Sequence, residues 1–101
     1  MDRIEELQKA ILTMHGCAST HLESVSVGIA LHDETVWEGQ VEVFEVRGHP
    51  QARRCYAWKV AAGYVAVLEL PPVTSPETAV INAYTHEITI PREAIKKSGL
   101  N

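Results

Sequence analysis

The stretch Val25-Ser-Val-Gly-Ile-Ala-Leu31 alternates apolar with small residues, and Trp37, Val41 and Val43 alternate with polar neighbours further along the chain. A period of two is typical of half-buried antiparallel strands. We extend this pattern to four consecutive strands between Val25 and Leu70, with one helical segment on each side. The sequence therefore predicts an α+β fold of order α-β-β-β-β-α, in which an antiparallel four-stranded meander carries both helices on one face.

Length and composition indicate one globular domain that spans residues 1–101. The chain is 46% hydrophobic and 22% charged, and its formal net charge of −4 disfavours a nucleic-acid or anionic-lipid partner. The first residues, Met1-Asp-Arg-Ile-Glu-Glu, are charged, unlike a secretory signal, and no apolar run reaches the length of a membrane span. We therefore expect a cytoplasmic protein without a membrane partner.

Local signals place the two helices. Asp2 is a helix-capping residue and Gly16 a left-handed terminator, so the first helix is predicted from Arg3 to His15. Ser75 followed by Pro76 is a typical helix start. The apolar stripe of this second helix is predicted to comprise Ala79, Val80, Ala83, Tyr84 and Ile88. The alternation in Glu87–Pro91 fits either a helix or a short strand, and a terminal helical turn is predicted after Pro91.

The phase of the strands predicts which residues share a face. A β-bulge near Val43–Phe44 would explain the change of parity in the second strand. Pairing of Val43 with Trp58, of Glu42 with Lys59 and of Val60 with Tyr64 then aligns the last three strands. In this alignment one face carries aromatic core residues, and the opposite face carries an apolar cluster that we predict to be a protein interface: Phe44, Cys55, Ala57, Val65 and Val67.

The polar and nucleophilic residues give weaker signals. We interpret Cys17 and Cys55 as free thiols that pack as small hydrophobic residues. His15, Cys17 and His21 lie close in sequence, but their spacing is not a standard zinc pattern, so we predict neither a metal site nor a cofactor. We also assign no catalytic residue.

Two further groups suggest alternative functions. Trp37 and Trp58 are candidates for lining a ligand pocket, although large aromatic residues of a small core are the simpler interpretation. Arg47, Arg53 and Arg54 surround a turn near aromatic residues, a combination that can bind RNA.

Several segments resemble small uncharacterised bacterial proteins, including some encoded on integron gene cassettes. They are Trp37–Phe44, Gly48–Pro50, Arg54–Trp58 and Leu70–Pro76. The resemblance spans roughly His15 to Ala83 and implies a compact α+β domain of unassigned role. It carries over no functional residue.

From these observations we expect a non-catalytic interaction module that forms a homodimer or docks on another protein. The alternative is a small-molecule binding or enzymatic domain that uses the histidine-bearing loops. RNA binding through Arg47, Arg53 and Arg54 is the third hypothesis.

Overall fold

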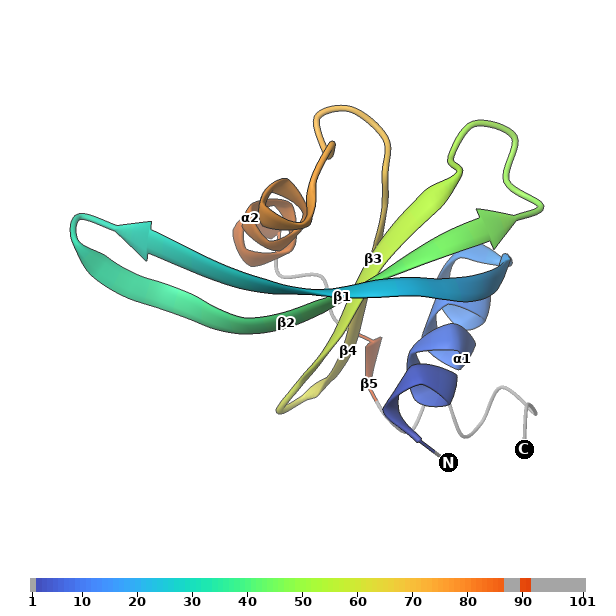
Figure 1. Ribbon diagram of the computed structural model, residues 1–101, viewed down its shortest axis with the longest axis horizontal. Coiled ribbons are helices and arrows are strands. Elements are labelled where there is room, and N and C mark those ends of the chain that lie inside the picture. Colours follow the sequence, from blue (N-terminus) through green and yellow to red (C-terminus); the bar gives the residue numbers. More distant parts are fainter. Residues whose placement is uncertain (1, 87–89, 92–101) are drawn as a thin grey trace.

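The computed structural model describes residues 2–86, 90 and 91, which form helices on an antiparallel sheet with the strand order β1-β2-β3-β4-β5. In chain order the elements are α1 (Arg3–His15), β1 (Ala18–Leu31), β2 (Glu34–Arg47), β3 (Arg54–Val60), β4 (Gly63–Leu68), α2 (Pro76–His86) and β5 (Ile90–Pro91). Figure 1 shows this arrangement. The predicted α+β fold and its antiparallel meander are confirmed.

Helix α1 begins and ends where the sequence predicts. The Asp2 carboxylate accepts the backbone N–H of Glu5 at 2.9 Å and so caps the first turn. Gly16 adopts a left-handed conformation, with φ of 70°, and its N–H donates to the Leu12 carbonyl. Leu7 and Ile11 are completely buried against the sheet.

The β1–β2 hairpin extends beyond the rest of the sheet. His32 and Asp33 form its two-residue turn, and both have positive φ, 52° and 68°, as a turn that follows the natural twist of the strands requires. Because β3 pairs with β2 only over Glu42–Glu45, residues 24–41 continue as a two-stranded ribbon. This ribbon is the long arm in Figure 1, and the molecule is 43 Å long.

The two helices lie on opposite faces of the sheet, so the prediction that both cover one face is wrong. Neighbouring residues of a strand point to opposite faces. In β3, Cys55 and Ala57 pack in the core with α1, whereas Tyr56 and Trp58 pack in the core with α2. In β2 all four residues from Val41 to Phe44 are buried, because this part of the sheet is covered on both sides.

The register of the β3–β4 hairpin differs from the prediction by one residue. Val60 pairs with Gly63 rather than with Tyr64. A slip of one residue moves every side chain of a strand to the other face. Tyr64 therefore lies in the core with α1, and Val65 lies in the core with α2.

The register between β2 and β3 differs by two residues. Glu42 pairs with Ala57, and Val43 pairs with Tyr56. A shift of two residues leaves every side chain on the same face of the sheet. The prediction of which β3 residues share a face with which β2 residues is therefore correct.

Strand β1 is longer than predicted and contains the bulge. It begins at Ala18 rather than Val25. Its first half pairs with β2 through the backbone but has no alternation of apolar and polar residues, so nothing in the sequence indicated a strand there. His21 faces Phe44 and Glu23 faces Val43, so Leu22 is the extra residue. The sequence predicted a bulge in the second strand, near Val43–Phe44. The structure has the bulge opposite these two residues, in β1.

Helix α2 begins at the predicted position. The Ser75 hydroxyl accepts the Thr78 N–H at 3.2 Å, and the Thr78 hydroxyl accepts the Ser75 N–H at 2.9 Å, a reciprocal cap. Ala79, Val80 and Ala83 are buried as expected. Tyr84, however, is 61% exposed and is not part of the stripe.

The end of the chain is described only in part. Ile90 and Pro91 form β5, which pairs with Gly63 and Tyr64, so at these two positions the structure has a strand. Ile88 and the terminal turn predicted after Pro91 lie outside the described residues.

Candidate functional site

The outer edge of β1 is the longest open strand edge of the described sheet. β1 has fourteen residues and only β2 as a neighbour. Proline, lysine and arginine are absent from it, and Glu23 is its one carboxylate. Natural sheets usually protect such an edge with lysine, proline or a bulge, because its unpaired N–H and C=O groups accept further strands. β1 carries only the bulge at Leu22.

The bulge is held by a buried carboxylate. Glu42 in β2 is 1% exposed. Nε2 of His21 lies 2.8 Å from its Oε1, and the Ser24 hydroxyl donates to the same oxygen. His21 and Ser24 are three residues apart and would point to opposite faces of a regular strand. The extra residue, Leu22, brings both onto the face that carries Glu42.

Helix α1 reaches the same carboxylate. Nη2 of Arg3 lies 3.2 Å from the other carboxylate oxygen of Glu42, Oε2. Oε2 accepts no hydrogen bond within the described residues. The ion pair with Arg3 is therefore the interaction that offsets the cost of removing this oxygen from water. Glu42 therefore connects the start of α1 with both strands of the hairpin and fixes β1 at the bulge.

The ribbon beyond the bulge has two different faces. On the α2 side it is apolar, with Val25, Val27, Ile29 and Trp37 packed in the core. On the α1 side Ser24, Ser26, Gly28 and Ala30 are exposed, and an open hollow of about 430 Å³ lies along the ribbon between Ser26 and Gln40. The outer side of the ribbon therefore presents small side chains and free backbone.

The exposed large apolar side chains lie on β1 and on the two helices. Among the described residues they are Leu12, Leu22, Ile81 and Tyr84, exposed by 39% to 61%. Leu22 belongs to β1 itself, and the others lie on α1 and α2, which both contact β1. Of these four, Leu22 is the one that belongs to the open edge strand itself.

A groove between α1 and β1 limits where a further strand can add. It has a volume of about 370 Å³, with Lys9, Leu12 and Cys17 among its lining residues. The Gln8 amide donates to the Ser19 carbonyl at 3.0 Å. Because the Gln8 side chain already binds the Ser19 carbonyl at the start of β1, that carbonyl cannot accept a bond from an added strand. The open part of the edge therefore lies between Ser19 and the hairpin turn.

The apolar interface predicted from the sequence does not form a surface. Phe44, Cys55 and Ala57 are buried under α1, and Val65 and Val67 are buried on the α2 side, all with at most 7% exposure. The one-residue slip in β4 separates the last two from the first three. These five residues are core residues. The sequence also allows a second prediction, in which residues 88–100 fold over this apolar cluster and leave the chain monomeric, but most of these residues lie outside the described part of the chain.

The tryptophan pair is part of the core on the α2 side. Trp58 is 3% exposed, and the Trp37 ring meets it edge to face with 5.9 Å between centroids. Trp37 also lies against Gly39, where an added Cβ would come within 3.1 Å of the indole. The core role of Trp58 is confirmed. The ligand-pocket hypothesis gains no support from this packing.

Three of the histidines are engaged in separate places. Nε2 of His15 lies 2.8 Å from the Ala66 carbonyl oxygen, and Nδ1 of His49 accepts the N–H groups of Gln51 and Ala52. His21 is bound to Glu42. The described residues include no group of three or more histidine, cysteine or acidic side chains placed to hold a metal ion.

The RNA hypothesis depends on arginines beside accessible aromatic rings. Arg47, Arg53 and Arg54 are exposed around the β2–β3 loop, but Tyr56 and Trp58 are each only 3% exposed. These rings cannot stack on bases. Tyr56 instead donates its hydroxyl to Glu69, and burial together with this bond raises the pKa of the phenol.

Both cysteines are free and buried, as predicted. Burial is the main cause that raises the pKa of the Cys55 thiol to about 12, and the nearby Cys17 adds to the shift. Such a thiol is a poor nucleophile at neutral pH. A search of the described helices shows none that is both long and apolar enough to span a bilayer.

Sequence reasoning missed the β1 edge and Glu42. The polar first half of β1 gave no strand signal, and Glu42 follows the same alternation as the exposed Glu38 and Gln40. Comparisons with protein-family models, curated proteins and solved structures found no match for this chain. The resemblance to integron-cassette proteins therefore stays a prediction.

Proposed function

We propose that this protein is a non-catalytic interaction module that self-associates by adding a strand to the outer edge of β1. The observation that carries the proposal is the open edge itself. Strand β1 lacks proline and lysine, its pairing with β2 is regular from Glu23 to Ile29, and the exposed Leu22 lies at the start of this part of the edge. Main-chain hydrogen bonds along the edge would supply affinity, and the apolar residues beside it would supply additional contact area.

The experiment is a measurement of solution mass by light scattering on three proteins. The wild-type chain of 11.2 kDa is expected to give twice this mass at micromolar concentration. Ser26→Lys places a positive charge in the exposed centre of the edge and is expected to give a folded monomer, whose melting temperature is lower only by the contribution of dimerisation.

Ala62→Lys is the matched control. It adds the same charge in the exposed β3–β4 turn, outside β1, and is expected to remain dimeric. A wild-type protein that stays monomeric at high micromolar concentration contradicts the proposal. So does a dimer that Ser26→Lys leaves intact.

A further inference from the structure

We infer that the partner of the β1 edge is a second copy of this chain in an antiparallel arrangement, in which the hairpin turn of each chain lies beside Arg47 of the other. This inference rests on the proposed function and adds the geometry of the dimer. It follows from the charges at the two ends of β1, from the position of the Arg47 side chain and from the alternation of side chains along the strand.

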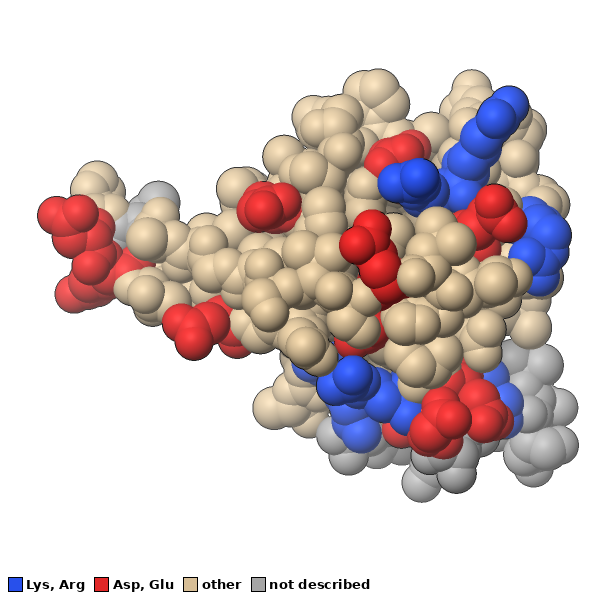
Figure 2. Space-filling model, viewed as in Figure 1, with Lys and Arg blue, Asp and Glu red and all other residues tan. Residues whose placement is uncertain are grey.

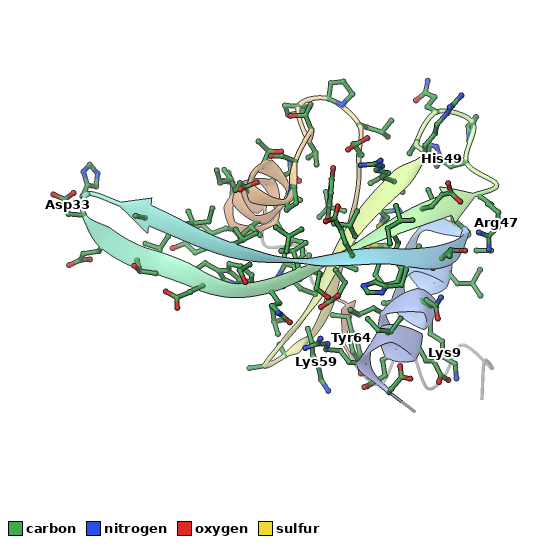
Figure 3. All side chains as sticks on the ribbon, viewed as in Figure 1. Lys9, Asp33, Arg47, His49, Lys59 and Tyr64 are labelled. Atoms are coloured by element: carbon green, nitrogen blue, oxygen red, sulfur yellow. The ribbon has the colours of Figure 1, made fainter. Side chains whose placement is uncertain are left out.

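The hairpin turn is acidic, whereas the other end of the hairpin carries Arg47 beside the exposed Glu45. Asp33, Glu34 and Glu38 are exposed at or near the turn, whereas Arg47 is exposed at the far end, where it pairs with Ala18. Figure 2 shows the acidic side chains at the tip of the ribbon and basic side chains at the other end of the molecule. Figure 3 places Asp33 and Arg47 at opposite ends of the long axis.

Arg47 projects its charge onto the edge strand. Its Nη1 donates to the Thr20 hydroxyl at 2.7 Å, so the guanidinium of this β2 residue lies across β1. A strand added to β1 would therefore meet a positive charge at one end of the edge and the acidic turn at the other.

Charge decides the direction of the added strand. Two copies of β1 that run parallel would bring the two acidic turns together and the two Arg47 side chains together, which is repulsive. An antiparallel pair, related by a two-fold axis perpendicular to the sheet, places each acidic turn beside the partner's Arg47. The charge pattern therefore fits a closed antiparallel dimer.

The alternation of side chains restricts the register. Directly opposed residues of an antiparallel pair point to the same face. A two-fold axis perpendicular to the sheet keeps each residue on the same face in both chains. The axis must therefore lie midway between one residue and the same residue of the partner subunit. With Ser26 at this position, Glu23 to Ile29 of both chains pair regularly, and the extra residue Leu22 shifts the count by one, so that Thr20 lies opposite Leu31 of the partner subunit. Since Arg47 binds Thr20, this register places the Arg47 guanidinium near the partner's acidic hairpin turn.

The same arrangement gives a role to the exposed residues of α2. A two-fold axis perpendicular to the sheet keeps both α2 helices on one side of the joint sheet. Because α2 packs over β1, Ile81 and Tyr84 of each chain lie on helices that both flank the seam between the chains. Their exposed side chains are available for apolar contact on that side of the joint sheet.

Disulfide trapping tests the register directly. Opposed Cα atoms in an antiparallel pair are about 4.5 to 5.5 Å apart, within the range that a disulfide bridges. Ser26→Cys is therefore expected to form a covalent dimer under mild oxidation. The natural cysteines are buried, so they give no background reaction.

Ala30→Cys is the matched control on the same exposed face of β1. In the inferred register the two copies of position 30 are about 26 Å apart, since they are offset by eight residues of about 3.3 Å each. This variant is expected to remain uncrosslinked. Crosslinking of both variants would indicate a parallel pair and overturn the inference, as would failure of Ser26→Cys in a protein that is dimeric by light scattering.

Charge reversal tests the contact between the ends. Arg47→Glu and Glu34→Arg are each expected to weaken the dimer roughly tenfold at low salt, and the double variant is expected to regain wild-type affinity. Dimers that neither single variant weakens would contradict the charge contact while leaving self-association through β1 intact. A monomeric wild type, in contrast, would contradict the proposed function itself.

Discussion

Replacement of Trp58 by alanine tests the packing that supports the ribbon. Trp58 is 3% exposed in the core on the α2 side, and its ring meets Trp37 edge to face. A buried tryptophan removes about 150 to 250 Å² from water, worth roughly 4 to 6 kcal/mol at about 25 cal/mol per Å². Measured aromatic truncations cluster at about 3 to 5 kcal/mol. We expect a loss of about 4 kcal/mol.

Urea unfolding measures this loss as a change in midpoint. Domains of this size lose about 1 to 3 kcal/mol per molar urea, so the midpoint is expected to fall by roughly 1.5 to 4 M. All variants are made in the Ser26→Lys background, because dimerisation would otherwise add a concentration-dependent contribution to stability.

Two further variants keep the test informative. Trp58→Phe retains most of the ring and is expected to fold even where Trp58→Ala does not. Tyr84→Ala removes an aromatic side chain that is 61% exposed and is expected to cost less than about 0.5 kcal/mol. A Trp58→Ala loss no larger than that of Tyr84→Ala would refute the assignment of Trp58 to the core.

Two other predictions concern buried ionisable groups. Glu42→Gln keeps the shape of the side chain but removes the charge that His21, Ser24 and Arg3 surround, and we expect it to cost about 1 to 3 kcal/mol in urea unfolding. Glu23→Gln, an exposed carboxylate of the same strand, is the control, and equal losses would contradict a special role of Glu42. Because the pKa of Cys55 is raised from 9.0 to about 12, the unfolded chain loses this proton first. Stability is therefore expected to fall between pH 9 and 12, by up to roughly 1.4 kcal/mol per pH unit, and to fall less steeply in Cys55→Ala. An unchanged slope in that variant would disprove the burial effect.

The features that the sequence predicted well depend on neighbours along the chain. Asp2, Gly16 and Ser75 act on backbone groups within four residues of themselves, so the helix boundaries could be inferred from local chemistry. The order of four strands also followed from local alternation and turn residues. Such signals do not depend on where the rest of the chain lies.

The faces of the sheet depend on long-range packing, and there the predictions failed. The sequence between Val60 and Tyr64 permits two turn lengths, and the one-residue difference exchanged Tyr64 and Val65 between the two cores. Burial of consecutive residues Val41–Phe44 looked like a change of phase. It reflects cover by a helix on each face, which no local pattern reveals.

Glu42 shows why the site itself could not be predicted. In sequence it is one of several glutamates that alternate with valine, and its partners come from α1 and from both sides of a bulge in β1. A carboxylate is buried at this position because three side chains from α1 and β1 are brought to it. The constellation exists in the folded chain and has no signature in the order of residues.

The position of the bulge links this network to the proposed interaction. A bulge normally ends strand pairing at an edge, and Glu42 fixes this one at Leu22, close to the part of β1 whose Ser19 carbonyl already accepts a bond from Gln8. From Glu23 to Ile29 the pairing with β2 is regular, and the only protective charge is that of Glu23 itself.

At the other side of the sheet, Ile90 and Pro91 pair with the first two residues of β4 and end in a proline, which cannot donate to a further strand. The chain thus has the means to block an edge and uses them away from the ribbon. Strand addition requires an edge that is regular and unblocked, and in this protein β1 meets both conditions from Glu23 to Ile29.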